Sequence, residues 1–249
     1  REEPLGGLDG VPLPYYEEYI LQISPDGKIL REISILDSIV SSGRQDLLFA
    51  NSGHGPVVHV PLDKDFTHLN DIEVLEAKDA AAFPQFREGD ILISLRNLNL
   101  LLVLDADTAE IKWSNVGPYL RQHDPDFLPD GKISVFDNRR DRRGGMEFGG
   151  SRVVTIDPGS RRTEVRYGYR DKQRFYTEVM GDHQYLPNGN IVITESIAGR
   201  AFEITPTDDI VWSFYDFWDS DSVIIIGRAI RYPRSYAAFA ADGKCGSAK

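Results

Sequence analysis

Hydrophobic and polar residues alternate with a period of two in many short stretches along the chain. Glycine, proline, aspartate and asparagine separate these stretches from one another. Alternation broken by turn-forming residues is typical of β-strands joined by hairpins. The pattern therefore predicts an all-β chain with little helix.

One recurring unit is a tight turn followed by a strand. It occurs as EGDILISLRN (88–97), DGKISVFDN (130–138) and NGNIVITES (188–196). The Asp-Gly and Asn-Gly pairs supply the positive φ angles that tight hairpins require. Because the same unit returns three times in the same context, the sequence indicates a repeat architecture.

A second unit consists of a strand, a polar turn and a strand, and it follows each copy of the first. The copies lie at 99–114, 151–168 and 199–214, with a further one near the front at 18–33. Together the two units give about four strands, and the repeat advances by 42 residues from Gly89 to Gly131 and by 58 from Gly131 to Gly189. Four-stranded units at such spacings are typical of β-propeller blades. A β-sandwich would also contain many short strands, but not in this repeated order.

We expect three full blades within a single β-propeller domain, or within the C-terminal part of one, over residues 1–249. The blades are expected at about 67–114, 122–168 and 181–214. The strand pair at 18–33 resembles the outer half of a fourth blade, and the tail at 223–239 could add one or two strands. A ring normally needs more blades. Either the chain is the back part of a longer propeller, or the ring is open or is completed by another chain, including a second copy.

Composition narrows the possible partners. A net charge of −11 argues against nucleic acid as a partner, since phosphate binding needs a basic surface. The basic cluster at 139–143 is either a solvated loop or a local attractor of anions. The single cysteine, Cys245, excludes an internal disulfide. The longest apolar run, 223–226, is too short to span a membrane, and no signal peptide opens the chain.

Each expected blade opens with a segment that contains a histidine. These segments are THLND (67–71), QHDPD (122–126) and GDHQY (181–185). The innermost strand of a propeller blade lines the central channel, so His68, His123 and His183 are expected to face one shared site. The alternative is three separate histidines, each with a structural role in its own blade. His54 and His59 have no partner in the repeat and are interpreted as loop residues.

An arginine at the end of a strand adds to this site. Arg96 and Asn97 end the strand in ILISLRN, at the position that Asp137-Asn138 and Glu195-Ser196 take in the other repeats. The planar fork of a guanidinium suits sulfate or phosphate. Beside the opening histidines, it predicts a pocket for an oxyanion.

Metal binding is the competing interpretation of clustered histidines. Asp124 and Asp126 could join His123, but no H-x-H, HExxH or close Cys/His spacing occurs. A glycine-rich phosphate loop, a nucleophile elbow and a dinucleotide fingerprint are also absent from the sequence. We therefore expect neither a metal nor a cofactor.

The segments THLNDIEVL, GDILISLRNLNLLLVLDADTAEIKW and QHDPDFLPDGKISVFDN together resemble the PAPS-independent, bacterial-type arylsulfotransferases. The likeness extends from about Thr67 to Phe214 and carries three ordered motifs: T-H-x-N, S-x-R-N and Q-H. It implies a β-propeller that moves a sulfuryl group from an aryl sulfate to a phenol, without a nucleotide cofactor or a metal. It also implies a periplasmic or secreted location. The family's N-terminal portion, with a further histidine-bearing blade, has no counterpart in this chain.

The resemblance assigns a role to each matching residue. His123 of the Q-H motif would be the nucleophile that forms a sulfohistidine, while His68, Asn70 and Arg96 would bind and polarise the sulfuryl group. Asn97, beside Arg96, and His183, which keeps the strand parity of His123, are expected to contact substrate. An insertion at 76–89 lengthens the spacing from His68 to Arg96. The alternative function is a non-catalytic propeller that serves as a binding or assembly module in a larger complex.

Overall fold

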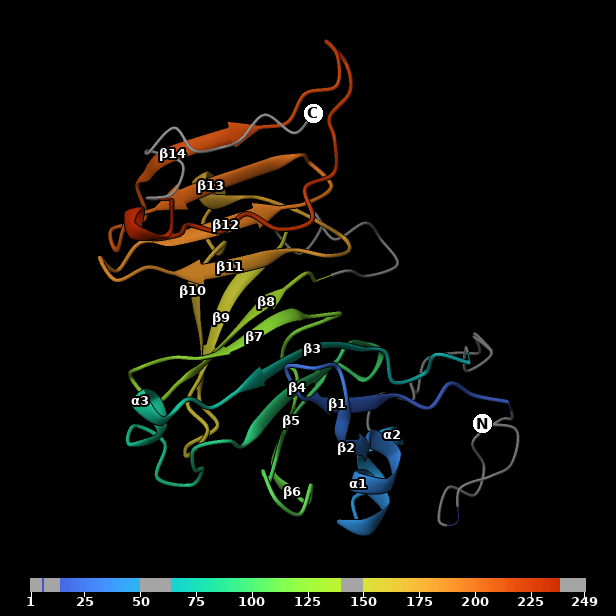
Figure 1. The fold of residues 1–249 in the computed structure, drawn as a ribbon. Helices are drawn as coiled ribbons and strands as arrows, with labels where there is room; N and C mark the ends of the chain where they lie inside the picture. The colour runs from blue at the N-terminus through green and yellow to red at the C-terminus, as the bar shows by residue number, and fades with distance from the viewer. Residues whose placement is uncertain (1–5, 7–13, 50–63, 140–149, 238–249) are drawn as a thin grey trace. The chain divides into compact units, whose positions relative to one another are not determined.

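Strands dominate the computed structural model, which describes residues 6, 14–49, 64–139 and 150–237 (Figure 1). Within these residues the strands form three four-stranded antiparallel sheets and one two-stranded sheet. The α-helices of the same part are short: α1 (Ile35–Ser41), α2 (Asp46–Phe49) and α3 (Ala77–Ala80). The all-β expectation is confirmed. None of the helices in the described ranges has the length and apolar character needed to cross a membrane.

Each four-stranded sheet follows the chain order, with every strand paired to the next. The first blade comprises β3 (Leu69–Val74), β4 (Ile91–Leu95), β5 (Leu100–Leu104) and β6 (Ile111–Val116). The second comprises β7 (His123–Phe127), β8 (Ile133–Asp137), β9 (Arg152–Ile156) and β10 (Thr163–Tyr167). The third comprises β11 (Asp182–Tyr185), β12 (Ile191–Glu195), β13 (Arg200–Ile204) and β14 (Ile210–Tyr215). Four-stranded antiparallel meanders of this kind are the blades of β-propellers.

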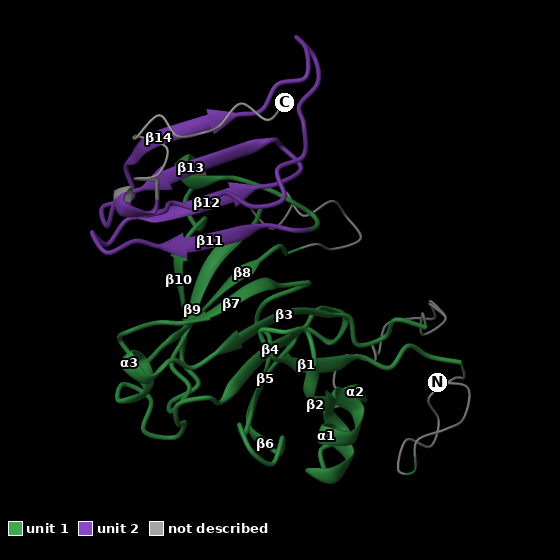
Figure 2. Cartoon of the chain, viewed as in Figure 1, with its two compact units in different colours: residues 1–179 green, residues 180–249 purple. Residues whose placement is uncertain are grey.

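The chain divides into two compact units, residues 1–179 and 180–249 (Figure 2). The first unit holds the first and second blades, and the second unit holds the third blade. The expectation of one propeller domain over the whole chain stays a prediction.

The front of the chain covers one face of the first blade. The strand pair expected at 18–33 is the hairpin of β1 (Tyr19–Ile23) and β2 (Ile29–Ser34). Ser34 then ends the strand and caps α1, because its hydroxyl accepts a hydrogen bond from the backbone N–H of Asp37 at 3.1 Å. Buried apolar residues of this hairpin and of α1 and α2 pack against β4 and β5. The two helices were not expected from the alternating pattern.

A second apolar cluster joins the first and second blades. Trp113 of β6 donates its indole N–H to the carbonyl of Pro158 at 3.1 Å, which ties the outer strand of the first blade to the second. The insertion at 76–89 also belongs here, since the rings of Phe83 and Phe127 meet edge to face at 5.1 Å. The insertion leaves the β3–β4 pair at the end where Val74 pairs with Ile91. His68 and Arg96 lie at the opposite end of that pair, so the insertion does not separate them.

A tail segment crosses one face of the third blade in the second unit. Residues 224–231, here called the strap, contact all four strands of this blade. The contacts are Arg228 with Asp182, the N–H of Ala229 with Thr194 Oγ1 at 3.1 Å, Arg231 with Gln184 and Glu203, and the guanidinium of Arg231 over the Trp212 ring.

The strap covers the face that corresponds to the apolar face of the first blade. The row Leu92, Val103 and Trp113 of the first blade belongs to the cluster that packs on the second blade. By ladder register the same row of the third blade is Val192, Glu203 and Trp212. The glutamate at its centre suits a partner with arginine side chains, which the strap supplies.

The expectation that the tail at 223–239 adds one or two strands is wrong for residues 223–237. Between residues 216 and 237 the chain forms only an isolated bridge, Phe217 with Val223, and a 3-10 turn, η4 (Arg234–Ala237). Within the strap, the N–H groups of Ala229 and Arg231 bond to side chains, and those of Ile224 and Ile226 bond to isolated backbone carbonyls, so no continuous ladder forms. Residues 238 and 239 lie outside the described part.

Candidate active site

The candidate site lies where the first strands of the first two blades begin. Strands β3 and β7 lie side by side within the first unit. His68 comes directly before β3 with a φ of 54°, and His123 is the first residue of β7. Arg96 follows the last residue of β4, and its backbone N–H bonds to the His68 carbonyl at 3.0 Å. The strand pairing therefore brings the T-H-x-N and S-x-R-N motifs together.

The ring of His123 is held through its Nδ1 atom. Nδ1 lies 2.7 Å from Asn138 Oδ1 and 3.1 Å from the Arg121 carbonyl oxygen. Asn138 donates its side-chain N–H to the Thr177 carbonyl at 2.9 Å, which turns its oxygen towards the imidazole. Both neighbours of Nδ1 are thus acceptors, so Nδ1 carries the proton of the neutral ring. The lone pair is left on Nε2.

The surroundings keep His123 uncharged. Burial lowers the pKa of His123 below its ordinary value of 6.5, and the electrostatic interactions with Arg96 and, to a smaller extent, His68 lower it further. The hydrogen bonds that His123 donates to Asn138 and to the Arg121 carbonyl raise the pKa of His123 but do not cancel the lowering. At neutral pH the ring is therefore a neutral base with a free lone pair on Nε2.

Two guanidinium groups converge on one amide oxygen beside this ring. Asn97 Oδ1 accepts hydrogen bonds from Nε and Nη2 of Arg96, both at 3.3 Å, and from Nη1 of Arg121. The Asn97 amide nitrogen donates to the Asp65 carbonyl at 2.5 Å, so its oxygen is fixed towards the arginines. Such a pair of cations favours an anion.

His68 and Asn70 are anchored by groups that the sequence did not indicate. Asp65 Oδ2 contacts Nδ1 of His68. Asn70 donates a side-chain N–H to the Gln122 carbonyl at 2.8 Å, and its own Oδ1 is buried with no hydrogen-bond partner among the described residues. One amide hydrogen of Asn70 is therefore already engaged within the protein.

The glutamine of the Q-H motif has a structural task. Gln122 is fully buried, and its side-chain N–H groups reach Ser94 Oγ at 3.0 Å and the Leu100 carbonyl at 3.2 Å. These bonds attach the start of β7 to the first blade, next to Arg96. Gln122 thus sets the distance between the two motifs rather than binding substrate.

A buried ion pair holds the loop that leads into β7. Asp137, the last residue of β8, is paired with Arg152 of β9, and its Oδ1 accepts from the N–H of Leu120 at 2.9 Å and of Arg139 at 3.1 Å. Burial raises the pKa of Asp137, and the charge of Arg152 opposes that rise. The pair fixes both Asn138 and the chain just before Gln122.

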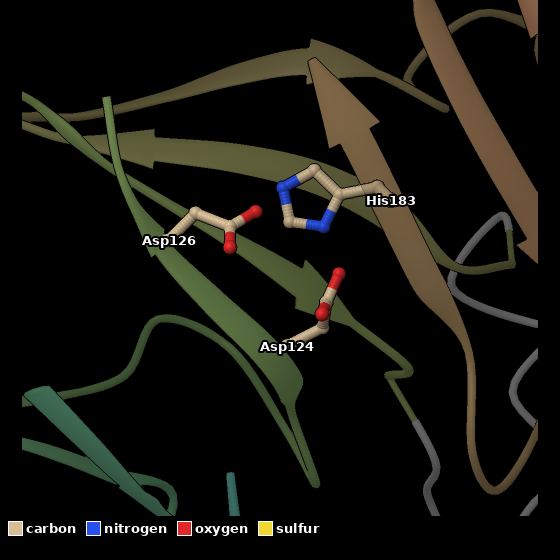
Figure 3. A group of neighbouring side chains, drawn as sticks. All are labelled: Asp124, Asp126 and His183. Carbon is tan, nitrogen blue, oxygen red and sulfur yellow. The ribbon is translucent and has the colours of Figure 1, made fainter. Parts of the chain in front are cut away.

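The structure brings five of the six expected site residues together in the first unit: His68, Asn70, Arg96, Asn97 and His123. His183 lies on β11 of the second unit, so its place in the pocket stays a prediction. Asp124 and Asp126 follow His123 on β7, and Figure 3 shows the side chains of these two aspartates. The expectations of no metal and no cofactor likewise stay predictions. His54, His59 and residues 140–143 lie outside the described part.

The ladder register does not give His183 the position of His123. His123 pairs with Phe136, and Asp126 with Ser134, so β7 carries one extra residue in between. Strand β11 has no such bulge, and Asp182 pairs with Thr194, the counterpart of Phe136. Asp182 is therefore the counterpart of His123. From the sequence, His183 was expected to have the same strand parity as His123, by counting back from the turn that follows each strand. That count fails because the extra residue in β7 reverses the side on which the residues before it point.

Two contributors to the site were not expected from the sequence. Arg121 stands directly before the Q-H motif, and only the fold brings it to Asn97. In the sequence repeat, Asp137-Asn138 aligned with Arg96-Asn97, but Asn138 received no role. The repeat therefore contained a sequence signal for a functional role of Asn138, whereas no sequence signal indicated one for Arg121.

Comparison with solved structures finds partial similarity at low identity. A protein of unknown function from Bacteroides caccae is 15% identical with a TM-score of 0.42, over 79% of this chain and 54% of that one. Virginiamycin B lyase from Staphylococcus aureus is 14% identical with a TM-score of 0.41, over 79% and 48%. Hydrazine synthase from Kuenenia stuttgartiensis is 15% identical with a TM-score of 0.42, over 69% and 41%. This chain thus spans roughly half the length of these proteins.

The sequence itself gives the more specific result. No protein of curated function matches it. A family model described as arylsulfotransferase (ASST) matches residues 14–217, which include both hairpins of the site and all three blades. Since this match covers most of the sequence, the chain belongs to the arylsulfotransferase (ASST) family.

Proposed function

We propose that the protein transfers a sulfuryl group from an aryl sulfate to a phenol through a covalent intermediate on His123. The observation that carries the proposal is the state of the His123 ring. Its Nδ1 faces two acceptors, its pKa is lowered, and Arg96 lies close enough to contribute to that lowering. An imidazole with a free Nε2 lone pair beside a cation is suited to attack the sulfur of an anionic ester.

In the first half-reaction, Nε2 of His123 forms a bond to sulfur. The bond between sulfur and the aryl oxygen breaks, and its electron pair leaves with the phenolate. The ring then carries a positive charge, with the proton still on Nδ1 and its hydrogen bond to Asn138 Oδ1 in place. No proton has to leave the ring for this step, because Nε2 already has its lone pair.

Arg96 and His68 have an electrostatic role in this scheme. The equatorial oxygens of the sulfuryl group carry negative charge as the bonds rearrange, and fixed cations and donors stabilise that charge. Arg96 is already oriented by Asn97, and His68 by Asp65. Little reorganisation is then needed when the donor binds.

In the second half-reaction, the oxygen of an acceptor phenolate attacks the same sulfur. The bond between sulfur and Nε2 breaks, and its electron pair returns to the ring, which restores neutral His123. The proton of the acceptor hydroxyl passes to the solvent. The two half-reactions share one pocket, so donor and acceptor bind in turn.

The test combines kinetics with mass analysis. The protein is mixed with a chromogenic aryl sulfate, and the trapped protein is digested and its peptides weighed. We expect a burst of released phenol, ping-pong kinetics, and a sulfuryl adduct on the peptide that contains His123. His123→Ala should lose the burst and the turnover while its thermal unfolding stays close to that of the parent, and His183→Ala should do less harm.

Three results would count against the proposal. An adduct on another residue, or undiminished turnover in His123→Ala, contradicts the assignment of the nucleophile. Absence of both adduct and turnover in the intact protein favours the alternative of a non-catalytic module. A periplasmic or secreted location also belongs to the proposal and rests on family membership alone. Completion of the propeller by further sequence or by a second copy belongs to it as well, because a ring normally needs more than three blades.

A further inference from the structure

We propose that Asn138 is a positioning residue that fixes the proton of His123 on Nδ1, and that the Thr177 carbonyl fixes Asn138 in turn. The inference rests on the proposed role of His123 as nucleophile. It adds a chain of three groups, from a backbone carbonyl through an amide to an imidazole. It predicts which nitrogen attacks and why an amide stands at position 138.

The chain begins in a fully buried network. Asn138, Ser151 and Thr177 all have no exposed surface. The Ser151 hydroxyl accepts from the Thr177 N–H at 3.1 Å and lies 3.2 Å from the Asn138 carbonyl oxygen and 3.3 Å from the Thr177 carbonyl oxygen. Ser151 thus joins the backbones of the two residues, which sets where the Thr177 carbonyl stands relative to the Asn138 side chain.

The orientation of the Asn138 amide follows from this carbonyl. A carbonyl oxygen only accepts hydrogen bonds, so the group that faces Thr177 at 2.9 Å must be the Asn138 NH₂. The amide oxygen then faces Nδ1 of His123 at 2.7 Å. A flipped amide would set its oxygen against the Thr177 carbonyl and its NH₂ against Nδ1, and buried groups without partners are costly.

A neutral acceptor suits the chemistry better than a charged one. A carboxylate at position 138 would stabilise the imidazolium and raise the pKa of His123, so that a proton would occupy Nε2 more of the time. An amide oxygen accepts from Nδ1 without adding a negative charge. Arg96 and His68 also act on the ring, and both lower the pKa of His123. Asn138 therefore orients the ring while the lone pair on Nε2 stays available.

The position itself is used differently in each blade. By register, Asn138 corresponds to Arg96 in the first blade and Ser196 in the third, each directly after the second strand. Ser196 Oγ accepts from the backbone N–H of Gly181 at 3.0 Å, just before the first strand of its own blade. The residue at this position reaches the start of the first strand in each blade, through its backbone N–H to the His68 carbonyl in the first blade, and only in the second blade does its side chain accept a hydrogen bond from a histidine ring. In the third blade the Ser196 hydroxyl alone holds the start of the first strand, so that structural role does not require an amide.

The experiment reads the ring directly by nuclear magnetic resonance with ¹⁵N-labelled histidine. In the parent, the neutral form of His123 should show its proton on Nδ1. In Asn138→Asp, the pKa of His123 should rise by about one unit or more, and the acid limb of turnover should move to higher pH by the same amount. The control is Asn188→Asp, an exposed turn residue that adds the same charge far along the chain and should move neither quantity.

The outcomes separate this inference from the proposed function. A parent ring with its proton on Nε2 would overturn the positioning role, whether or not the Asp variant folds. So would an Asp variant whose His123 keeps the pKa of the parent. A raised pKa of His123 in a protein that transfers no sulfuryl group supports the positioning role while the proposed function fails.

Discussion

Nδ1 of His123 donates its hydrogen to the side-chain oxygen of Asn138 across 2.7 Å. The two residues are 15 positions apart and stand at the same end of the antiparallel pair β7–β8, in which His123 pairs with Phe136. A hairpin therefore supplies both the reacting ring and the group that orients it. The adjacent hairpin β3–β4 supplies His68 and Arg96 in the same manner.

The pH dependence of turnover follows from the state of His123. Attack needs the neutral ring, and burial lowers the pKa of His123 below 6.5. We expect the midpoint of the acid limb of turnover to lie below pH 6.5, and turnover to fall about tenfold per pH unit once the pH is below the lowered pKa. The measurement is kcat from pH 4.5 to 8 with a chromogenic aryl sulfate.

Folding must be followed at the same pH values. The unfolded chain takes up a proton on this histidine at higher pH than the folded chain, so the folded state loses stability as the pH falls below 6.5. Circular dichroism at each pH separates this loss from the titration of the nucleophile. An acid limb centred above pH 6.5 in folded protein would contradict the assignment.

Replacing Arg96 with lysine should weaken anion binding although the charge is kept. The guanidinium presents a planar fork, and the Asn97 oxygen already holds two of its nitrogens. We expect sulfate or an aryl sulfate to raise the unfolding temperature of the parent by more than that of Arg96→Lys. Equal protection of both proteins would show that Arg96 does not bind the anion.

Asn97→Asp should reduce anion affinity by placing a negative charge between the two arginines. The Asn97 oxygen accepts from both Arg96 and Arg121, so a carboxylate there would pair with both guanidinium groups. We expect the Kd for an aryl sulfate, measured by calorimetry, to rise at least tenfold. The control is Asn188→Asp, which adds the same charge at an exposed turn of the third blade and should leave the Kd unchanged. Unchanged affinity would mean that the two cations do not face the anion.

Gly131→Ala tests the contact between the insertion and the second blade. A Cβ at this position would lie 2.4 Å from the Ala82 carbonyl oxygen, and the φ of 81° already disfavours a side chain. Gly27 has a similar φ of 84° but open space around it, so Gly27→Ala isolates the cost of the backbone conformation, about 1 kcal/mol. We expect Gly131→Ala to lose about 1–3 kcal/mol more than this control in chemical unfolding. Equal losses would mean that the insertion does not press on the turn.

Arg231→Ala should loosen the strap, residues 224–231, from the third blade. The variant loses an ion pair to Glu203 at 3.0 Å and the contact with the Trp212 ring at 4.4 Å. We expect a loss of about 1 kcal/mol and faster hydrogen exchange at the Ala229 and Arg231 amides. Arg162→Ala breaks an exposed ion pair with Glu164 and should leave those amides as they are. Unaltered exchange in Arg231→Ala would show that the arginine does not hold the strap.

The sequence by itself determined the strands, the blade unit and the motif residues. Alternation of polar and apolar residues and the Asp-Gly and Asn-Gly turns are local signals, and strand pairing within a hairpin follows from them. For this reason the sequence alone could place His68 with Arg96, and His123 with its neighbours, at strand ends. The sequence did not predict the short helices α1 and α2 or the strap, because packing against a blade face, rather than local alternation, decides their conformation.

Only the tertiary structure decided the register and the contacts between blades. Because β7 contains one extra residue, the residue of the third blade that corresponds to His123 is Asp182 and not His183. A bulge of this kind leaves no mark in the pattern of hydrophobic residues. The tautomer of His123 depends on the Thr177 carbonyl, 54 residues away in sequence. The meeting of Arg121 with Asn97 likewise depends on packing of one blade against another. Hydrogen-bond direction and charge proximity are properties of positions in space, so the chemistry of the site emerges only when the blades are assembled.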